Sequence, residues 1–436
     1  MDFLENKGLS IKDNLLYIGN WSCSDLVNKF NTPIYVINEK IIVNRYQTLY
    51  NTLKKYYDKI RIHYAVKANT NMAILKILKN LGSYLDCVSP GEIYIAKNVG
   101  FKPEKILYTG NNYTNDELKF ALDNKVMLNL DAISQIDRLI STINKGKFSN
   151  NRPLISFRVN PEFGGGHHEH VITAGPNVKF GILERDIISA YKKAIDMGFT
   201  KFGIHMHIGS GILDVAIFKI AAEKFFKIIE LIKANLDINF DFIDLGGGLG
   251  IPYNPSEEPL DLDQYAKTII EIFKTYNEKC SLEDPYFCIE PGRFIVAESC
   301  IILSKVNTIK KMRDQNYVGI DAGLNLLIRP SLYGSYHHVV VANKMDQTSK
   351  EIYNIAGPIC ESGDILARNR SLPSIEEGDI IAILDAGAYG FTMSSNYNMR
   401  PRPAEILING NKINIVREKE SFKDLITKQR IPDYLQ

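Results

Sequence analysis

Lys67 has the residue type and the position of a nucleophile, because it directly continues the apolar run Ile60–Val66. At the end of a buried strand an amine is desolvated, which lowers its pKa and makes it nucleophilic. A lysine at such a position can also lay its aliphatic stem along apolar surface and keep its ammonium group in water. Taken alone, the position of Lys67 leaves both interpretations open.

A glycine-rich segment, Gly246-Gly247-Gly248-Leu249-Gly250, follows the apolar run Phe240–Leu245. Successive glycines let a backbone approach a phosphate closely, so the segment predicts a phosphate cradle, with a plain tight turn as the alternative. It does not fit the dinucleotide-binding fingerprint, because Ile251 and Tyr253 stand where the third glycine is required.

His205 and His207 stand two residues apart on one expected strand, so their side chains face the same side. A metal-dependent hydrolase uses such a pair as ligands, but it needs further ligands at other strand ends, and the remaining histidines are poorly placed for that. We therefore predict no metal site and expect a histidine here to stack on a ligand or hydrogen-bond to it. Glu290-Pro291-Gly292-Arg293 adds an acid and a base after the run Phe287–Ile289, and an ion pair is the alternative explanation for them.

The elements that must position these residues alternate between strand and helix. Eight short β-rich apolar runs are each followed by a segment with helical spacing, which predicts a closed (β/α)8 barrel of the TIM type, although an open doubly wound sheet has the same local pattern. The runs are 60–66, 84–88, 105–109, 126–130, 154–159, 202–208, 240–245 and 287–289, and helical segments include 72–81, 92–99, 116–122, 187–197 and 217–234.

The active site of such a barrel lies at the carboxyl ends of its strands. Glycine or polar residues follow seven of the eight predicted strands, and they include Lys67, Ser89–Glu92, Gly110-Asn111, Asn160, Gly209-Ser210, Gly246–Gly248 and Glu290–Arg293. This distribution is typical of a functional site and not of a packing layer.

The chain after Arg293 changes to strands and turns. The runs 300–306, 317–320, 338–341, 352–355, 380–384, 404–408 and 413–416 predict a second domain that is a β-sandwich or β-barrel, and the strand-like pieces 15–18 and 34–37 are expected to join it. We therefore predict a barrel domain over residues 36–292 and a β-rich domain formed by residues 1–35 and 293–436.

Composition excludes several classes of function. The 436 residues carry 52 Lys plus Arg against 50 Asp plus Glu, a formal charge of +2 that is too even to attract nucleic acid. The six cysteines form no C-x-x-C pair, and neither a signal peptide nor an apolar stretch of about 18 residues is present. We expect no membrane association and a cytoplasmic location.

Seven motifs, in order along nearly the whole chain, resemble those of the diaminopimelate decarboxylases, a family of fold-type III pyridoxal-phosphate enzymes. They are Tyr64-Ala-Val-Lys67-Ala-Asn, Ser89-Pro-Gly-Glu92, His205-Met-His-Ile-Gly-Ser210, Asp244-Leu-Gly-Gly-Gly-Leu-Gly250, Glu290-Pro-Gly-Arg293, Gly357-Pro-Ile-Cys-Glu-Ser-Gly-Asp364 and Gly387-Ala-Tyr389. The resemblance implies decarboxylation of meso-2,6-diaminopimelate to L-lysine with pyridoxal 5'-phosphate as cofactor.

The resemblance also assigns cofactor contacts. Lys67 matches the lysine that holds pyridoxal phosphate as a Schiff base, Glu290 the carboxylate at the pyridine nitrogen, and His207 the imidazole beside the ring. The implied phosphate contacts and the rest of the cofactor-binding set are Ser210, Gly246, Gly247, Gly248, Pro291, Gly292, Arg293 and Tyr389.

Substrate recognition is implied by a further set of residues. The groups of the family that bind substrate are matched by Arg293, Arg329, Tyr333 and Tyr389. Of these, Arg293, Arg329 and Tyr333 resemble the groups that hold the substrate carboxylates. Cys360 and Glu361 resemble a pair that reaches the site from the other subunit of a homodimer, with Cys360 as the catalytic proton donor and Glu361 reading the distal amino group.

Two features depart from the family pattern. Pro90 stands where relatives more often have glycine or alanine, and the segment Gly164–His170 with His167, His168 and His170 is untypical; we expect a loop near the mouth of the site, with adventitious metal binding as the alternative.

Other functions remain as alternatives. They are an ornithine or arginine decarboxylase, an alanine-racemase-like enzyme, and a non-catalytic relative. Cys360-Glu361-Ser362 together with Arg329 and Tyr333 favours diaminopimelate as the substrate.

Overall fold

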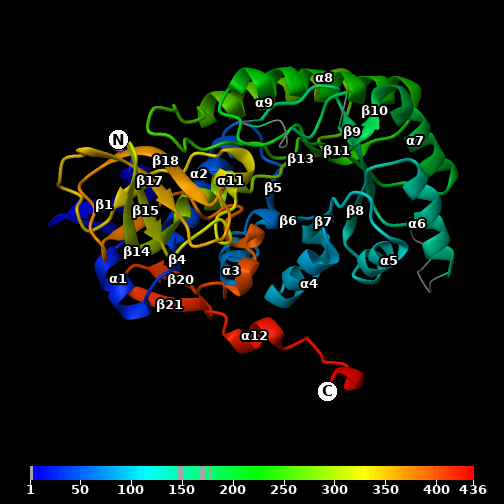
Figure 1. Cartoon of the computed structure of the whole chain (residues 1–436). Coiled ribbons are helices and arrows are strands. Elements are labelled where there is room, and N and C mark those ends of the chain that lie inside the picture. The colour runs from blue at the N-terminus through cyan, green and yellow to red at the C-terminus, as the bar shows by residue number, and fades with distance from the viewer. Residues whose placement is uncertain (1–2, 146–151, 167, 169–171, 177) are drawn as a thin grey trace. The chain divides into compact units, whose positions relative to one another are not determined.

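A computed structural model of the chain describes residues 3–145, 152–166, 168, 172–176 and 178–436 (Figure 1). The chain forms two compact units. The barrel unit comprises Val43–Pro252 and Glu258–Ile295, and the β unit comprises Met1–Ile42, Tyr253–Glu257 and Val296–Gln436.

Eight parallel strands close into a barrel in the first of these units. Their order is β9 (Ile155–Asn160), β11 (Phe202–Met206), β12 (Phe240–Asp244), β13 (Tyr286–Ile289), β5 (Ile60–Ala65), β6 (Tyr84–Cys87), β7 (Ile106–Tyr108) and β8 (Met127–Leu130), and short β10 (Ile182–Leu183) adds to β9. Because β8 pairs with β9, the sheet is closed, so the predicted (β/α)8 barrel is confirmed and the open doubly wound sheet is excluded.

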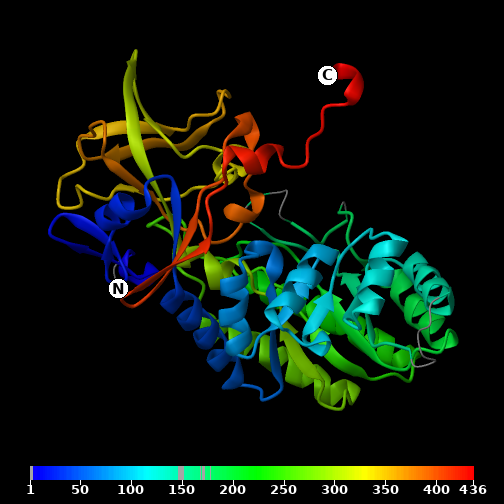
Figure 2. The same ribbon diagram turned by 90° about the horizontal axis from the view of Figure 1, so that it is seen from below.

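Helices surround these strands (Figure 2). They are α2 (Glu39–Lys54), α3 (Met72–Asn80), α4 (Pro90–Val99), α5 (Asn115–Asp123), α6 (Ser134–Lys145), α7 (Glu184–Asp196), α8 (Val215–Asn235) and α9 (Leu262–Cys280). The strands are buried on both faces, as in parallel sheets covered by helices, and strand residues such as Leu85, Leu107 and Phe242 have no exposed surface.

Pro90, the departure from the family pattern, has a local explanation in α4. Ser89 is the N-cap of this helix and accepts a hydrogen bond from the Glu92 N–H, and Pro90 occupies the first turn. Proline is favoured at the first helical position, because its fixed φ suits the helix and its missing N–H has no helical partner there. Pro90 is therefore compatible with the turn between β6 and α4.

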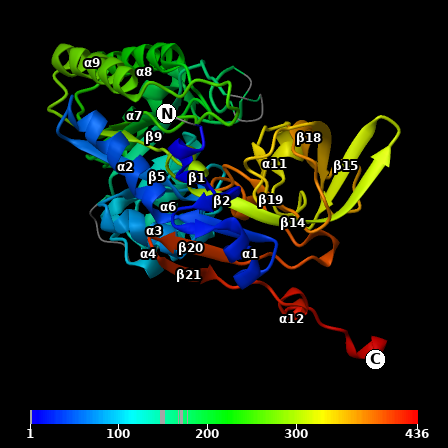
Figure 3. The ribbon, with the colours of Figure 1, turned by 90° about the vertical axis from the view of Figure 1, so that its left-hand side faces the viewer.

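The β unit contains a sheet in the order β18 (Ile365–Leu372), β17 (Glu351–Ala356), β15 (Gln315–Ile320), β14 (Cys300–Met312), β4 (Ile34–Asn38), β20 (Glu405–Asn409) and β21 (Lys412–Arg417). The long strand β14 lies in the middle of this sheet: its first part pairs with β4 and with β19 (Ile380–Ile383), and its second part pairs with β15 (Figure 3). The separate, mostly β domain is thereby confirmed.

N-terminal strands complete the β unit. β4 pairs with β14 and β20, so the predicted domain boundary at residue 36 falls inside a strand of the β unit's sheet. β1 (Leu9–Lys12), β2 (Leu15–Ile18) and β3 (Trp21–Ser22) form a three-stranded sheet, and β16 (Val339–Val341) pairs with β19. Leu16, Leu303 and Ile408 share one buried cluster, which joins the N-terminal and C-terminal segments of the chain.

The helices of the described residues include none that is both long and apolar enough to cross a membrane.

Candidate active site

Lys67 lies in the short turn that follows β5, and its amine contacts the carboxylate of Asp86 at the end of β6. Asp86 is fully buried and also accepts a hydrogen bond from the hydroxyl of Thr109, after β7. Burial by itself would raise the pKa of Asp86, but the charge and the hydrogen bonds of its partners lower it below its usual value. Asp86 is therefore ionised, and it fixes the position of an amine whose side chain keeps 32% of its surface exposed.

Glu290 follows β13 and forms a buried pair with His205 of β11, with 3.0 Å between Oε2 and Nε2. Burial and the nearby Asp86 carboxylate raise the pKa of Glu290; burial would lower the pKa of His205, but the Glu290 carboxylate outweighs this and raises it. The pair therefore holds a proton readily. The second carboxylate oxygen of Glu290, Oε1, is buried and has no hydrogen-bond partner among the described residues.

The glycine segment after β12 packs tightly against its neighbours. A Cβ on Gly247 would lie 2.2 Å from the carbonyl oxygen of Glu290, and one on Gly246 would lie 2.4 Å from that of Met206. Gly246 and Gly248 also have positive φ angles of 70° and 106°. Only glycine fits this close approach of three backbone segments.

Some backbone N–H groups of this segment, but not all, donate hydrogen bonds to other described residues of the protein. Gly246 donates to Asp244 at 2.8 Å, and Gly247 donates to Nδ1 of His207 at 3.0 Å. Among the described residues, the N–H of Gly248 has no acceptor. A phosphate cradle would therefore use Gly248 directly, while Gly246 and Gly247 set the course of the backbone.

The hydrogen bond from Gly247 also fixes the state of His207. Because Nδ1 accepts from a backbone N–H, a neutral ring carries its proton on Nε2. Burial, followed by the charges of Arg158, Lys67 and His205, lowers the pKa of His207 well below its ordinary value. His207 is accordingly a neutral imidazole.

The segment Glu290–Arg293 lies beside the Lys67 turn. The carbonyl of Pro291 accepts a hydrogen bond from the Ala65 N–H at 3.2 Å, and a Cβ on Gly292 would lie 2.9 Å from the Cβ of Ala68. Arg293 is buried and donates through Nη2 to the hydroxyl of Ser210 at 3.1 Å. The barrel unit thus contains Lys67, His207, Ser210, Gly246, Gly247, Gly248, Glu290, Pro291, Gly292 and Arg293.

The remaining predicted site residues belong to the β unit. Arg329 begins the short helix α11 (Arg329–Tyr333), which ends at Tyr333, and its buried guanidinium lies over the ring of Tyr253 at 4.8 Å. His337 Nδ1 lies 2.8 Å from the carbonyl of Leu384, so Nδ1 carries the proton and Nε2 accepts from Arg329 Nη1 at 2.8 Å.

Cys360 and Glu361 are exposed at the tip of the loop 357–364. The buried carboxylate of Asp364 closes this loop, since it accepts hydrogen bonds from the N–H groups of Leu324 and Ile359 at 2.6 and 2.7 Å. A Cβ on Gly357 would lie 2.3 Å from the same carboxylate. These contacts therefore hold the loop in one defined conformation.

Tyr389 lies in a second constrained turn of the β unit. Its φ of +57° is in the left-handed region, which bulky residues rarely adopt. A Cβ on Gly387 would lie 1.8 Å from the carbonyl oxygen of Val296, so this turn requires a glycine two residues before the tyrosine.

Sequence reasoning missed Asp86, Arg158 and His337. Asp86 and Arg158 are each the single charged residue in an apolar strand run, a signal that could have marked them as buried functional groups. Arg158 Nη2 donates to the carbonyl of His207 at 3.4 Å. His337 carried no such signal, because its role depends on Arg329 eight residues away.

Within the part of the chain that the structure describes, two buried clusters have donor spacing compatible with a metal ion: His63–Asp244–Cys288 and His205–Asp244–Glu290. Burial raises the pKa of the Cys288 thiol well above its ordinary value, which disfavours the thiolate that a metal requires. The second cluster already contains the His205–Glu290 hydrogen bond. We therefore retain the prediction of no metal site. His167 and His170, considered above for metal binding, lie outside the described residues.

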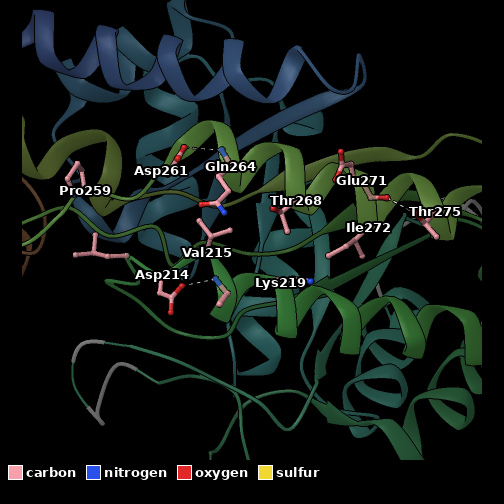
Figure 4. A pocket seen from close by; sticks show the side chains of 12 residues that line it. Asp214, Val215, Lys219, Pro259, Asp261, Gln264, Thr268, Glu271, Ile272 and Thr275 are labelled. Atoms are coloured by element: carbon pink, nitrogen blue, oxygen red, sulfur yellow. Dashed lines mark hydrogen bonds between the residues drawn. The ribbon is translucent and has the colours of Figure 1, made fainter.

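A groove of about 630 Å³ lies on the outer helices of the barrel, between the start of α8 and α9 (Figure 4). Asp214, Lys219, Asp261 and Gln264 line it, and none of the predicted site residues does. This groove is therefore separate from the residues gathered at the strand ends.

Comparison with known proteins gives a consistent family. Residues 42–297 match the family of pyridoxal-dependent decarboxylases, pyridoxal binding domain. The diaminopimelate decarboxylase of Methanothermobacter thermautotrophicus is 48% identical over 417 residues, 96% of each chain, and that of Archaeoglobus fulgidus is 41% identical over 430 residues, 98% of this chain and 99% of the other.

Solved structures agree with these relatives. The crystal structure of a diaminopimelate decarboxylase from Methanocaldococcus jannaschii in co-complex with L-lysine has a TM-score of 0.91 and 35% identity, and the match covers both chains completely. A lysine/ornithine decarboxylase from Vibrio vulnificus, complexed with putrescine, has a TM-score of 0.74 at 19% identity over 89% of this chain and 97% of the other, which shows the shared fold alone.

The close approach at Gly247 can be tested by adding one methyl group. Gly247→Ala should destabilise the protein by about 1–3 kcal/mol, because the new Cβ meets the carbonyl of Glu290 and the backbone must shift. Thermal unfolding would measure the loss. Gly91→Ala is the matched control, since its Cβ would make only an ordinary 3.7 Å contact with Ser89; equal stability of the two variants would contradict the packing described for the glycine segment.

Proposed function

The chain belongs to the diaminopimelate decarboxylase family of pyridoxal-dependent decarboxylases, and on this basis we propose that it converts meso-2,6-diaminopimelate to L-lysine and carbon dioxide with pyridoxal 5'-phosphate as cofactor. L-lysine, the product of this reaction, is named in the co-complex of a relative. The six cysteines are all free, as expected of a reducing compartment, so we place the reaction in the cytoplasm.

One observation carries the proposal: an amine, a buried carboxylate oxygen without a partner and a glycine backbone segment meet at neighbouring strand ends of one barrel. These are the groups that an aldehyde, a protonated pyridine nitrogen and a phosphate require. The unpartnered Oε1 of Glu290 supports the assignment most strongly, because a buried polar atom without a hydrogen bond is costly unless a ligand completes it.

Pyridoxal phosphate, when bound, supplies an aldehyde that condenses with amines and a pyridinium ring that accepts the electrons released when carbon dioxide leaves. Lys67 would hold the aldehyde carbon until the substrate amine replaces it. Asp86, as an ionised group, positions the Lys67 amine.

Glu290 and His207 would act on the cofactor ring from two directions. Glu290, held in place by His205, would accept the N–H of the ring nitrogen with its unused oxygen, and its negative charge as a carboxylate would keep that nitrogen protonated. His207 presents a neutral imidazole to the ring, because a cation beside a pyridinium would oppose its protonation.

The phosphate would be bound by Gly248, Ser210 and Arg293, whose N–H, hydroxyl and guanidinium groups are donors for anions. Gly246, Gly247, Pro291 and Gly292 shape the backbone around this position, and Tyr389 would add a hydroxyl from the β unit.

Substrate selectivity is assigned to groups that match both ends of diaminopimelate. Arg329, held by His337, would pair with the distal carboxylate together with Tyr333, and Glu361 would pair with the distal ammonium group. Arg293 and Tyr389 would contact the substrate near the reacting carbon. A paired acid and base at the far end rejects ornithine and arginine, which lack the distal carboxylate.

Cys360 would donate the proton that replaces carbon dioxide. Cys360 and Glu361 are exposed at a loop tip, where water would compete for both groups. We therefore propose that a second copy of the chain covers them and that the enzyme is a homodimer with active sites shared across the interface.

The reaction is tested by offering the protein and pyridoxal phosphate meso-diaminopimelate, ornithine and arginine side by side. Carbon dioxide release should be confined to diaminopimelate. Lys67→Arg should retain the charge opposite Asp86, and hence the fold, yet lose activity by about a thousandfold or more, because a guanidinium is not a nucleophile at neutral pH. Preferential turnover of ornithine or arginine would contradict the substrate assignment, and an active Lys67→Arg variant would contradict the role of the lysine.

Glu361→Gln tests how the distal amino group is recognised. The substitution keeps the size of the side chain and an oxygen for Tyr397 but removes the charge. It should lower kcat/KM for diaminopimelate by about 10- to 100-fold, the range of one hydrogen bond to a charged group. 2-Aminopimelate, which lacks the distal amino group, is the control substrate and should be affected little; equal losses on both substrates would remove Glu361 from selectivity.

Shared sites are tested by mixing two inactive proteins. Cys360→Ala should slow turnover by about 10²- to 10⁴-fold, as expected for loss of a general acid. The Cys360→Ala protein is then unfolded and refolded together with an equal amount of Lys67→Arg protein. Half of the resulting dimers should contain one chain of each kind, and each mixed dimer should have one intact site out of two. The mixture should therefore regain about a quarter of wild-type activity. No recovery, with mixed dimers demonstrated by mass, would contradict the shared site.

A further inference from the structure

Asn398 binds Cys360 through both ends of its side-chain amide. Its Oδ1 accepts a hydrogen bond from the backbone N–H of Cys360 at 2.9 Å, and its Nδ2 lies 3.1 Å from the Cys360 sulfur. The two residues are 38 positions apart in the sequence, and the 357–364 loop and the short turn η7 (Tyr397–Met399) bring them together.

The orientation of this amide is determined by chemistry. The backbone N–H of Cys360 can only donate, so it must face the amide oxygen, and the NH₂ group must then face the sulfur. The sulfur of Cys360 is therefore a hydrogen-bond acceptor. An N–H donor aimed at sulfur stabilises the thiolate relative to the thiol.

Backbone conformation at Asn398 supports a specific role. Asn398 and Met399 have φ angles of 56° and 55°, in the left-handed region that L-residues rarely adopt. Asparagine tolerates this region better than most residues, and glycine tolerates it best. A turn selected for ease of folding alone would carry glycine, whereas asparagine adds the two contacts to Cys360.

We propose that Asn398 is a positioning residue for the proton donor: it fixes the direction of the Cys360 side chain and stabilises the thiolate that remains after proton transfer. This inference rests on the proposed function. In the step concerned, the S–H bond breaks and its proton passes to the carbon that has lost carbon dioxide. The electron pair of that bond stays on sulfur beside the amide N–H, and the thiolate regains a proton from water before the next cycle.

Other charged groups near Cys360 act on the same thiol. The carboxylate of Glu361 opposes a thiolate, but it is engaged by the hydroxyl of Tyr397, and this hydrogen bond raises the pKa of Tyr397 to about 12. Arg400 donates to the carbonyl of Pro358, two residues before Cys360, and its positive charge favours the thiolate. The Tyr397 hydroxyl also hydrogen-bonds to Cys360. Asn398 adds an amide N–H at 3.1 Å from the sulfur, so its removal should shift the thiol.

The test measures the pH dependence of Cys360 alkylation by iodoacetamide in the holoenzyme, followed by mass spectrometry of the Cys360 peptide. Asn398→Gly is the principal variant, because glycine keeps the left-handed backbone and removes both hydrogen bonds. We expect its alkylation midpoint to rise by about one pH unit, the size of one hydrogen bond to a charged group. Asn398→Asp should raise the midpoint at least as far, since an oxygen then faces the sulfur.

Cys280, half-buried in α9 of the barrel unit, is the internal reference and should be alkylated equally in all variants. An unchanged Cys360 midpoint in Asn398→Gly, with an unchanged Cys280 rate, would overturn the proposal. The outcome is independent of turnover: failure of the wild-type enzyme to decarboxylate diaminopimelate would refute the proposed function while leaving the thiol shift to be judged separately.

Discussion

The contact between the Lys67 amine and the buried carboxylate of Asp86 is the interaction on which the site depends. A carboxylate without surface exposure is tolerated only when it is paired and hydrogen-bonded, and Asp86 meets this requirement through Lys67 and Thr109. These three residues stand at the ends of consecutive strands β5, β6 and β7. Closure of the barrel therefore fixes where the amine lies, and the amine in turn keeps Asp86 ionised.

The neighbouring strand ends, those of β11, β12 and β13, depend on backbone packing. The glycine segment after β12 approaches β11 and β13 so closely that no Cβ fits at Gly246 or Gly247, and the same approach brings a backbone donor to Nδ1 of His207. Burial lowers the pKa of this histidine, so it is neutral. Glu290 is held by His205 with one oxygen unused. The ends of β11, β12 and β13 thus offer a neutral imidazole and a carboxylate with one oxygen unused, and the adjoining end of β5 offers the Lys67 amine. An oxygen that can accept an N–H, close to a neutral imidazole, suits a ring that must carry a proton and accept electrons.

The strands and helices of the barrel were predictable because their apolar spacing is a local property, and the motifs at strand ends followed from the rule that active sites lie there. Asp86 and Arg158 were not predicted as site residues, because their partners belong to other strands. Local sequence spacing does not indicate which residues of different strands contact each other. Strand β18 was missed because polar residues interrupt it, as in Ala367–Arg370. The contact of Asn398 with Cys360 depends on two turns that are distant in sequence, so no spacing rule could reveal it. The roles of the individual site residues remain predictions.

The most direct test of the central claim locates the lysine that bonds to the cofactor. The protein is loaded with pyridoxal phosphate, reduced with borohydride, digested and mapped by mass spectrometry. The account predicts a pyridoxyl group on Lys67 and on no other of the chain's lysines. A label on a different lysine, or no label on a protein that binds the cofactor, would contradict it.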